Sequence, residues 1–352
     1  MMKVLHSADW HLGAPMVRGG EDLRWAQEAL PFRIAELVHR HGCDLVLLSG
    51  DLFDGVPSRE MLESTKDAFR KMTVPVLIAP GNHDFVTTVS PWQTEIFPEN
   101  VYIFTKPLLE SVLLPQLDCR VYGAGYDSMD CPPLLRDFRA EGNERYVLGV
   151  LHGDPQVLHS PYCPITAEQV RESGLDYLAL GHIHKSGQFR TGATLCAWPG
   201  CPMGRGFDEY GQKGVLLVTL DDGVSAQFLP LDVPQFHELT VAATDDPPTA
   251  LGGVLPPSAT RDYFRVTLTG ECPAIDTDCL KRQFSQFCHL ELIDRTTPPV
   301  DLWASAGNDT LEGIYFRMLQ HQLEEDPRRE NQIRLAAKLS RQILDGQEVA
   351  LP

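Results

Sequence analysis

The sequence predicts an α/β fold, followed by a small α/β module and a helical C-terminal tail. In the first two thirds of the 352 residues, short apolar runs alternate with segments of helical periodicity. Residues 243–259 are rich in proline, glycine and aspartate, and a shorter strand–helix–strand pattern follows them. Strands that alternate with helices indicate a mostly buried sheet covered by helices.

The first region supplies most of the expected elements. Strands are expected at residues 4–5, 45–48, 74–79, 146–151 and 177–180. A first helix is expected over residues 21–41, where these apolar residues recur at helical spacing: Leu30, Ile34, Leu37 and Val38. A second helix should open at Pro57 and bury one face: Met61, Leu62, Ala68 and Phe69. Residues 213–229 predict a β-hairpin with its turn at 221–223.

The later region is expected to form two further parts. Residues 243–259 are predicted to be a linker or long loop. Strands at 263–268 and 290–293, with a helix at 277–287, would form the small module. The tail should be helical, with Asp309 as N-cap and Glu312 three residues on. Its two apolar stripes are Leu311, Ile314, Tyr315, Met318 and Leu319, then Ile333, Leu335, Ala336, Leu339, Ile343 and Leu344. The predicted domains are 1–232, 233–299 and 300–352.

Composition restricts the classes of function. The formal net charge of −18, from 30 basic and 48 acidic residues, disfavours broad electrostatic binding to nucleic acid or an anionic membrane. A locally positive site remains compatible with it where metal ions supply the charge. No apolar run is long enough for a membrane span, and the first residues do not resemble a secretory signal. Nine scattered cysteines without a Cys-x-x-Cys pair favour a reducing, cytoplasmic compartment.

Five polar clusters stand directly after apolar runs. They are Asp9-Trp10-His11, Gly50-Asp51-Leu52-Phe53-Asp54, Gly81-Asn82-His83-Asp84, Leu151-His152-Gly153 and Gly181-His182-Ile183-His184. Ligands of α/β sheets bind at the carboxyl ends of strands, so these clusters are expected to converge. Their carboxylate, amide and imidazole groups suit manganese, iron or zinc. The two oxygens of Asp51 would allow it to bridge two metals about 3.5–4 Å apart.

Each cluster also has an ordinary explanation. Asp9 is a possible turn residue, Asn82 suits an Asx-turn, and His152 suits a core histidine with a satisfied ring. The glycines before Asp51, Asn82 and His182 are expected to allow tight turns that a Cβ would obstruct. The coincidence of such clusters at five strand ends favours the metal site over these separate explanations.

The order of the five clusters resembles that of the calcineurin-like metallophosphoesterases. This resemblance implies a four-layer α/β/β/α sandwich with a binuclear metal centre. Residues 9–13, 48–54 and 180–185 are similar to the SbcD-type DNA repair exonuclease subunits. Residues 199–209 and 213–215, with the small module and the tail, resemble the bacterial YhaO-like branch of that group.

The resemblance also implies roles for individual residues. Asp9, His11, Asp51 and His184 would hold one divalent metal, and Asp51, Asn82, His152 and His182 the other. Manganese is favoured, with iron, zinc or magnesium as alternatives. A metal-bridging hydroxide would attack phosphorus in line. His83 would donate a proton to the leaving oxygen or orient the phosphate. Asp84 would either fix the His83 ring or serve only in the turn.

Other residues near the motifs leave alternatives open. Lys185 and Arg205 are candidates for phosphate contact. In archaeal and eukaryotic relatives a histidine often stands where this chain has Asp54, which leaves the polarity of cleavage open. These aromatic residues either line a nucleic-acid channel or, as is more common, pack in the core: Trp10, Phe53, Phe85 and Trp92. Four basic residues of the second predicted helix either contact backbone phosphates or form a solvated helix face. They are Arg59, Lys66, Arg70 and Lys71.

Three functions are compatible with these features. The leading one is a DNA exonuclease or endonuclease that acts as a subunit of an SbcCD-like complex with an SMC-like, SbcC-like ATPase. The apolar stripes of the tail would either dock on the ATPase, as the resemblance implies, or pack on their own domain. The resemblance also implies a homodimer. A phosphoesterase for small phosphodiesters or phosphoproteins is the second, and a non-catalytic partner-binding scaffold is the third. The complete ligand set disfavours the scaffold, and the resemblance of the module favours the nuclease.

Overall fold

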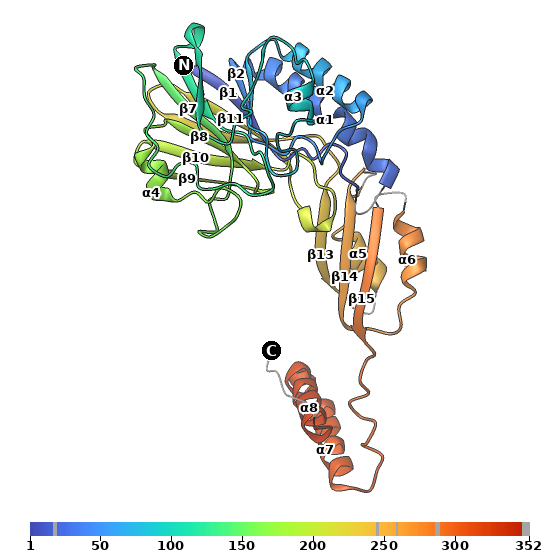
Figure 1. Cartoon of the computed structure of the whole chain (residues 1–352). Coiled ribbons are helices and arrows are strands. Elements are labelled where there is room, and N and C mark those ends of the chain that lie inside the picture. The colour runs from blue at the N-terminus through green and yellow to red at the C-terminus, as the bar shows by residue number, and fades with distance from the viewer. Residues whose placement is uncertain (17–19, 244–245, 258–259, 286–288, 347–352) are drawn as a thin grey trace. The chain divides into compact units, whose positions relative to one another are not determined.

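The computed structural model describes residues 1–16, 20–243, 246–257, 260–285 and 289–346. It divides into two compact units, of which the first holds residues 1–239 with the starts of strands β14 (Tyr263–Glu271) and β15 (His289–Thr297). The rest of the chain forms the second unit (Figure 1). Within the described ranges, no helix combines the length and apolarity needed to cross a bilayer. The predicted boundaries after residues 232 and 299 remain predictions.

Two six-stranded sheets form the first unit. In spatial order, the first sheet contains β12 (Val224–Pro230), β11 (Gly214–Leu220), β1 (Met2–Ser7), β2 (Leu45–Leu48), β3 (Val76–Ile78) and β4 (Val101–Ile103). The second contains β5 (Glu110–Leu114), β6 (Cys119–Gly123), β7 (Tyr146–His152), β8 (Tyr177–Gly181), β10 (Thr194–Gly200) and β9 (Lys185–Thr191). β1 to β4 are parallel, as are β6, β7, β8 and β10. The carboxyl ends of each parallel set therefore share one edge.

Alternating side chains along the strands build the layers. On β1, Val4 packs into the core between the two sheets, whereas Leu5 packs against the helices outside the first sheet. Those helices are α1 (Gly20–His41), α2 (Arg59–Met72) and α3 (Pro91–Thr94), on the same side of the first sheet in Figure 1. The short helix α4 (Ala167–Glu172) covers the outer face of the second sheet, where Val170 packs on Leu178. The fold is thus the expected four-layer α/β/β/α sandwich.

The remaining elements include a small sheet and a helical hairpin. The sheet has the order β13 (Phe236–Ala242), β14 and β15. Helices α5 (Pro247–Gly252) and α6 (Thr277–Phe284) belong to the second unit. The hairpin of α7 (Leu311–Glu325) and α8 (Glu330–Leu344) has its own apolar core, formed by Ala306, Phe316, Leu319, Ile333 and Ala337. The short 3-10 helices are η1 (Pro115–Leu117), η2 (Phe207–Glu209) and η3 (Pro327–Arg329).

Three expectations about element ends need correction. The predicted loop over 243–259 contains helix α5, which Asp246 caps by accepting a hydrogen bond from the Thr249 N–H, with proline at the first turn. The cap of α7 is Thr310 rather than Asp309, because the Thr310 side chain accepts from the Gly313 N–H. Helix α2 begins after Ser58, whose hydroxyl accepts from Met61, and not at Pro57.

Candidate metal centre

The five polar clusters meet where the parallel strands of the two sheets end. Asp9 and His11 follow β1, Asp51 follows β2, Asn82 and His83 follow β3, His152 ends β7, and His182 and His184 follow β8. Hydrogen bonds connect the two sets of strand ends. The His182 N–H donates to Asp9, at 3.0 Å from Oδ1, and the His152 Nδ1–H donates to the Ser49 carbonyl at 2.9 Å. The sheets therefore bring these segments to one place.

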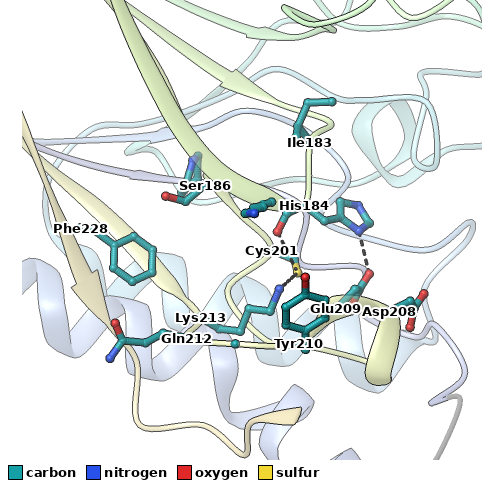
Figure 2. A pocket seen from close by; sticks show the side chains of 13 residues that line it. Ile183, His184, Ser186, Cys201, Asp208, Glu209, Tyr210, Gln212, Lys213 and Phe228 are labelled. Carbon is teal, nitrogen blue, oxygen red and sulfur yellow. Dashed lines mark hydrogen bonds and ion pairs between the residues drawn. The ribbon is translucent and has the colours of Figure 1, made fainter. Parts of the chain in front are cut away.

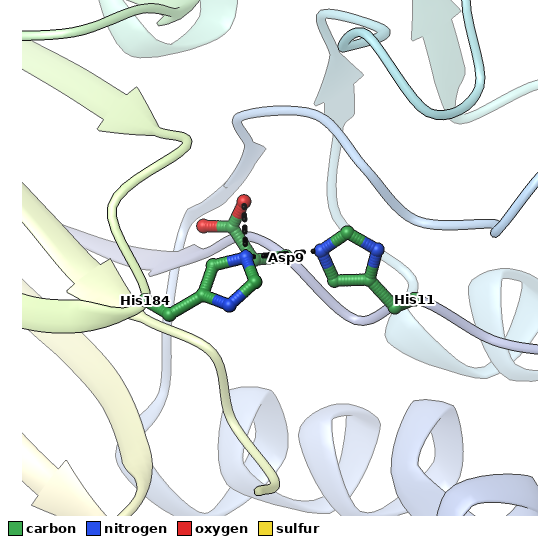
Figure 3. A group of neighbouring side chains, drawn as sticks. All are labelled: Asp9, His11 and His184. Carbon is green, nitrogen blue, oxygen red and sulfur yellow. Dashed lines mark hydrogen bonds and ion pairs between the residues drawn. The ribbon is translucent and has the colours of Figure 1, made fainter. Parts of the chain in front are cut away.

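Asp9, His11 and His184 form a first group of potential ligands (Figure 3). The Nε2 atoms of His11 and His184 lie 3.1 Å apart, and His184 Nε2 lies 4.0 Å from Asp9 Oδ1. Asp9 and His11 are almost fully buried. Asp51 Oδ2 lies 3.8 Å from His11 Nε2, so it adjoins this group.

Asp51 and His152 form the centre of a second group. Asp51 Oδ2 lies 3.4 Å from His152 Nε2, and Asn82 Oδ1 lies 3.0 Å from the same nitrogen. Asp51 thus stands between the two groups, where a bridging carboxylate would be needed. The His182 ring centroid lies 5.3 Å from that of His152. Among the described residues, His182 joins no cluster of three potential ligands within 4.8 Å, so its predicted role has the weakest geometric support.

Four of the predicted ligands have backbone torsions that L-residues rarely adopt. Asp9, His11, Asp51 and His182 have φ of 54°, 47°, 52° and 94°. Such conformations cost about 1–3 kcal/mol each and persist where the surrounding fold imposes them. Their concentration at one site indicates that the strand ends turn sharply in order to direct these side chains inward.

The glycines beside the ligands serve two different purposes. Gly50 has φ of +89°, so it provides the expected tight turn. Gly81 and Gly181 lie outside the left-handed region, and for them the expectation that a Cβ would obstruct the chain is confirmed by close contacts. A Cβ on Gly81 would lie 2.3 Å from Asp51 Oδ1, and one on Gly181 would lie 1.9 Å from the Ser49 carbonyl oxygen. These two glycines are required because other groups approach the backbone closely.

The electrostatics of the cluster favour cation binding. Burial raises the pKa of Asp9 to about 6, lowers that of His11 to about 3 and lowers that of His182 to about 4. Burial also opposes ionisation of Asp51, but the neighbouring His152 and His11 hold the pKa of this carboxyl well below its usual range. For His152, Asp51 outweighs the effect of burial and raises the pKa to about 9. A proton on His152 thus neutralises part of the buried negative charge, as a metal ion would.

In His152 and His184, the ring nitrogen that faces away from the cluster, Nδ1, has a hydrogen-bond partner in the protein. His152 Nδ1 donates to the Ser49 carbonyl, and His184 Nδ1 donates to Glu209 Oε1 at 2.7 Å. Burial opposes the charge of Glu209, but hydrogen bonds from His184 and Arg205 keep the pKa of this carboxyl far below its usual range. These contacts direct both Nε2 atoms toward the cluster, which is how protein partners orient imidazole ligands. Glu209 was not predicted, and its only signal is its place in the segment similar to YhaO-like proteins.

His83 lies at the exposed side of the cluster. Its N–H donates to Asp51 Oδ1 at 2.9 Å, and its Nδ1 lies 2.7 Å from Asp54 Oδ1. Asp84 does not hold this ring. Its carboxylate accepts hydrogen bonds from the N–H groups of Gly81, Leu52 and Phe53. These hydrogen bonds fit the turn role given as the alternative for Asp84, and the side chain in contact with His83 Nδ1 is Asp54.

The two candidates for phosphate contact differ. Arg205 donates from Nη2 to Glu209 Oε1 at 2.6 Å, so its guanidinium is held by that carboxylate. Lys185 is exposed at the start of β9, on the wall of a cavity of about 600 Å³ that His184 also lines (Figure 2). Among the predicted channel aromatics, Trp10, Phe53 and Trp92 are buried, so core packing explains them.

The residues present fit a pair of divalent cations. The Nε2 atoms of His11 and His184 face each other, and among the described residues the buried Nδ1 of His11 has no hydrogen-bond partner. Ligand distances of about 2.0–2.2 Å to nitrogen and oxygen place neighbouring ligand atoms roughly 3–4 Å apart, as the measured separations do. The oxygen and imidazole donors suit manganese, iron or zinc. Cys201 also neighbours His184 and Glu209, but burial raises the pKa of its thiol to about 12, which disfavours ligation.

Comparisons with known proteins agree with this geometry. The family model of calcineurin-like phosphoesterases matches residues 2–186. The metallophosphoesterase YhaO of Bacillus subtilis (strain 168) is 29% identical over 249 residues, which cover 64% of this chain and 59% of YhaO. The SbcD subunit of the nuclease SbcCD of Escherichia coli O157:H7 is 24% identical over 293 residues, 69% of this chain and 71% of SbcD. Among solved structures, a dimetal phosphatase from Danio rerio is 12% identical, with a TM-score of 0.44 over 64% of this chain and 95% of that one.

Proposed function

The chain belongs to the calcineurin-like phosphoesterase family, and we propose that it hydrolyses DNA phosphodiesters as the nuclease subunit of a complex with an SMC-like ATPase. Membership supports a hydrolase of phosphoesters. The observation that carries the catalytic part of the proposal is the convergence of Asp9, His11, Asp51, His152 and His184 around one buried space. The similarity to the SbcCD nuclease subunit supports DNA as the substrate.

The residues of the cluster would share the work of hydrolysis. Asp9, His11, Asp51 and His184 would hold one cation, and Asp51, Asn82, His152 and His182 the other. Two such cations would supply positive charge to the phosphodiester and an activated water. Glu209 would hold the His184 ring, and the Ser49 carbonyl that of His152, in the orientation that ligation requires.

His83 would handle the proton of the leaving group. Its Nδ1 donates to the Asp54 carboxylate, which orients the ring and leaves Nε2 as the nitrogen that would carry the transferred proton. The ring is 42% exposed, so a substrate oxygen can reach it. Donation from Nε2 to the departing 3′ or 5′ oxygen would prevent formation of an alkoxide.

The C-terminal hairpin supports the proposed ATPase partner. Its core is satisfied within α7 and α8, yet Leu311, Met318 and Ile343 remain 85%, 60% and 64% exposed. Exposed apolar residues that repeat along a helix are typical of a surface that packs on another helix. Docking on the helical base of the ATPase would cover them, so we favour docking over packing on the chain's own domain.

A small phosphodiester or a phosphoprotein is the second candidate substrate. The net charge of −18 favours it, because a nuclease that acts alone usually presents a basic surface to DNA. The partner ATPase would remove this difficulty by supplying DNA affinity. We therefore retain the nuclease as the leading proposal.

Degradation of linear duplex DNA with Mn²⁺ tests the proposal. The reactions should include EDTA, an Asp51→Asn variant and a small chromogenic phosphodiester as a second substrate. DNA loss with Mn²⁺ that is absent with EDTA and in Asp51→Asn would support a nuclease. Hydrolysis of the small ester alone, with no DNA cleavage even after addition of the cognate ATPase, would contradict it and favour the second candidate.

A further inference from the structure

The cavity beside the metal centre contains a buried lysine that the proposed hydrolysis does not use. The cavity measures about 600 Å³, and its lining includes His184, Lys185, Ser186, Tyr210 and Lys213 (Figure 2). His184 lines the cavity and also belongs to the metal centre, so the cavity adjoins the centre at this residue. A polymeric substrate held at the metals would have this cavity as a neighbour.

Lys213 is only 6% exposed, which is unusual for a lysine. Its Nζ donates to Cys201 Sγ at 3.2 Å, the dashed contact of Figure 2. Within the described part of the chain, no carboxylate forms an ion pair with it. Cys201 is buried as well, so this contact does not return the ammonium group to water.

Glu209, the buried acidic residue beside Cys201, is committed to other partners. Glu209 Oε1 accepts from His184 and from Arg205 Nη2, and Oε2 accepts from the Arg205 N–H. An ammonium group removed from water without a full counter-charge is costly. An anion in the cavity would supply that counter-charge and use the remaining protons of Nζ.

We propose that Lys213 binds the phosphate next to the scissile one in the substrate strand, which makes the cavity a subsite for a neighbouring nucleotide. The proposal rests on the proposed DNA substrate and adds the residue that would select a polynucleotide over a small ester. DNA carries a phosphate at every nucleotide, so a strand held at the metals places another one nearby. Tyr210 is 58% exposed on the cavity wall and offers a ring on which a base can stack.

A Lys213→Met variant tests this subsite, because methionine retains most of the length without the charge. Its matched control is Lys106→Met, which removes the same charge from an exposed, ion-paired lysine outside the site. With a single-stranded oligonucleotide and Mn²⁺, we expect KM to rise roughly tenfold or more in Lys213→Met. The loss of kcat/KM should be at least roughly tenfold greater for the oligonucleotide than for a small chromogenic phosphodiester. Lys106→Met should match the wild type on both substrates.

Two measurements that need no activity complete the test. In EDTA, the Tm of Lys213→Met should equal or exceed that of the wild type, because the variant removes a buried charge without an acidic partner. Inorganic phosphate should raise the Tm of the wild type and of Lys106→Met, and do so far less for Lys213→Met.

The outcomes separate this proposal from the nuclease proposal. A lower Tm for Lys213→Met, an unchanged phosphate effect, or equal losses on both substrates would overturn the subsite, because each indicates a structural role or a role at the metals. If the wild type hydrolyses only the small ester, even after addition of the cognate ATPase, the nuclease proposal fails. The phosphate-dependent Tm then still decides whether Lys213 binds an anion.

Discussion

Individual histidines in the candidate metal centre differ in what holds their second ring nitrogen. His152 donates to a backbone carbonyl, which substitution cannot remove, whereas His184 depends on the side chain of Glu209. Glu209 is buried and also pairs with Arg205. The orientation of His184 is therefore the part of the centre most open to a single substitution outside the ligand set.

Glu209→Gln is expected to weaken Mn²⁺ binding about 10–100-fold, the usual effect of removing a carboxylate behind a histidine ligand. The neutral amide can still meet His184 Nδ1 but no longer polarises the ring or balances Arg205. Mn²⁺ titration by calorimetry measures the change. The matched control is Asp208→Asn, which removes the same charge from the exposed neighbour. Equal affinities of the two variants would refute the role of Glu209.

His83 is expected to act on the proton and not as a ligand. His83→Gln should lower kcat about 10²–10⁴-fold, the range for removal of a general acid, while Mn²⁺ affinity stays within about twofold of the wild type. Asp54→Asn should lower kcat less, because the ring remains but loses the carboxylate that orients it through Nδ1. Since His83 also neighbours His11 and Asp51, a parallel fall in Mn²⁺ affinity would instead identify it as a ligand.

At the level of the elements, the sequence predicted where the strands end. It did not predict which residues hold the second ring nitrogen of the histidine ligands. A strand that ends in a sheet buried on both faces shows as an apolar run that stops at a polar cluster, as at Leu48 before Asp51. Because parallel strands end at one edge, the meeting of the clusters followed from the sequence. Glu209 lies on the separate turn η2, 25 residues from His184, and no periodicity connects them.

Shorter features depended on contacts that a sequence pattern does not contain. Helix α5 was hidden because proline and glycine, which usually mark loops, here occupy the first turn and the end of a six-residue helix. Asp309 and Thr310 are adjacent and both suit an N-cap, so the sequence does not decide which of them begins α7. Gly81 looked like a turn glycine, yet its constraint is the approach of Asp51 from another strand end.

Strand β1 carries a buried histidine that should make stability depend on pH. His6 Nδ1 lies 2.8 Å from the Tyr177 hydroxyl on β8, and Nε2 lies 2.7 Å from the Ser49 hydroxyl after β2, so this ring connects the two sheets. Burial lowers the pKa of His6 to about 3, against a smaller opposing effect of the Leu180 backbone. Below pH 6.5 the unfolded chain binds a proton at His6, whereas the folded chain keeps this ring neutral until the pH approaches 3.

The free energy of unfolding should therefore fall by about 2 kcal/mol between pH 6.5 and 5 through His6 alone. Urea unfolding in EDTA at the two pH values measures the total, and a His6→Asn variant should lose less stability over this interval than the wild type. The raised pKa of Asp9 acts in the opposite direction, but it is common to both proteins and cancels in the comparison. His159→Asn, at an exposed position, is the control. Equal pH dependence of the wild type and His6→Asn would exclude this effect.

At the scale of the whole molecule, acidic charge and an exposed apolar hairpin point to the same dependence on a partner. A chain with a net charge of −18 repels a DNA backbone everywhere except near bound cations and local lysines. Leu311, Met318 and Ile343 of α7 and α8 remain exposed once the hairpin core has formed. A partner that covers the hairpin and presents basic surface to DNA would resolve both features.

The isolated chain should consequently bind linear duplex DNA weakly, with an affinity that falls steeply as salt rises, and the cognate ATPase should restore tight binding. A Leu311→Ser, Met318→Ser, Ile343→Ser variant should lose that restoration because its docking face is polar, while hydrolysis of a small phosphodiester continues. A Val157→Ser, Leu158→Ser variant removes exposed apolar residues elsewhere and should behave as the wild type. Fluorescence anisotropy of labelled DNA across a salt series measures both effects. Tight binding by the isolated chain at physiological salt would show that DNA affinity arises within this chain. Full restoration of DNA binding in the hairpin variant would show that the ATPase docks on another surface.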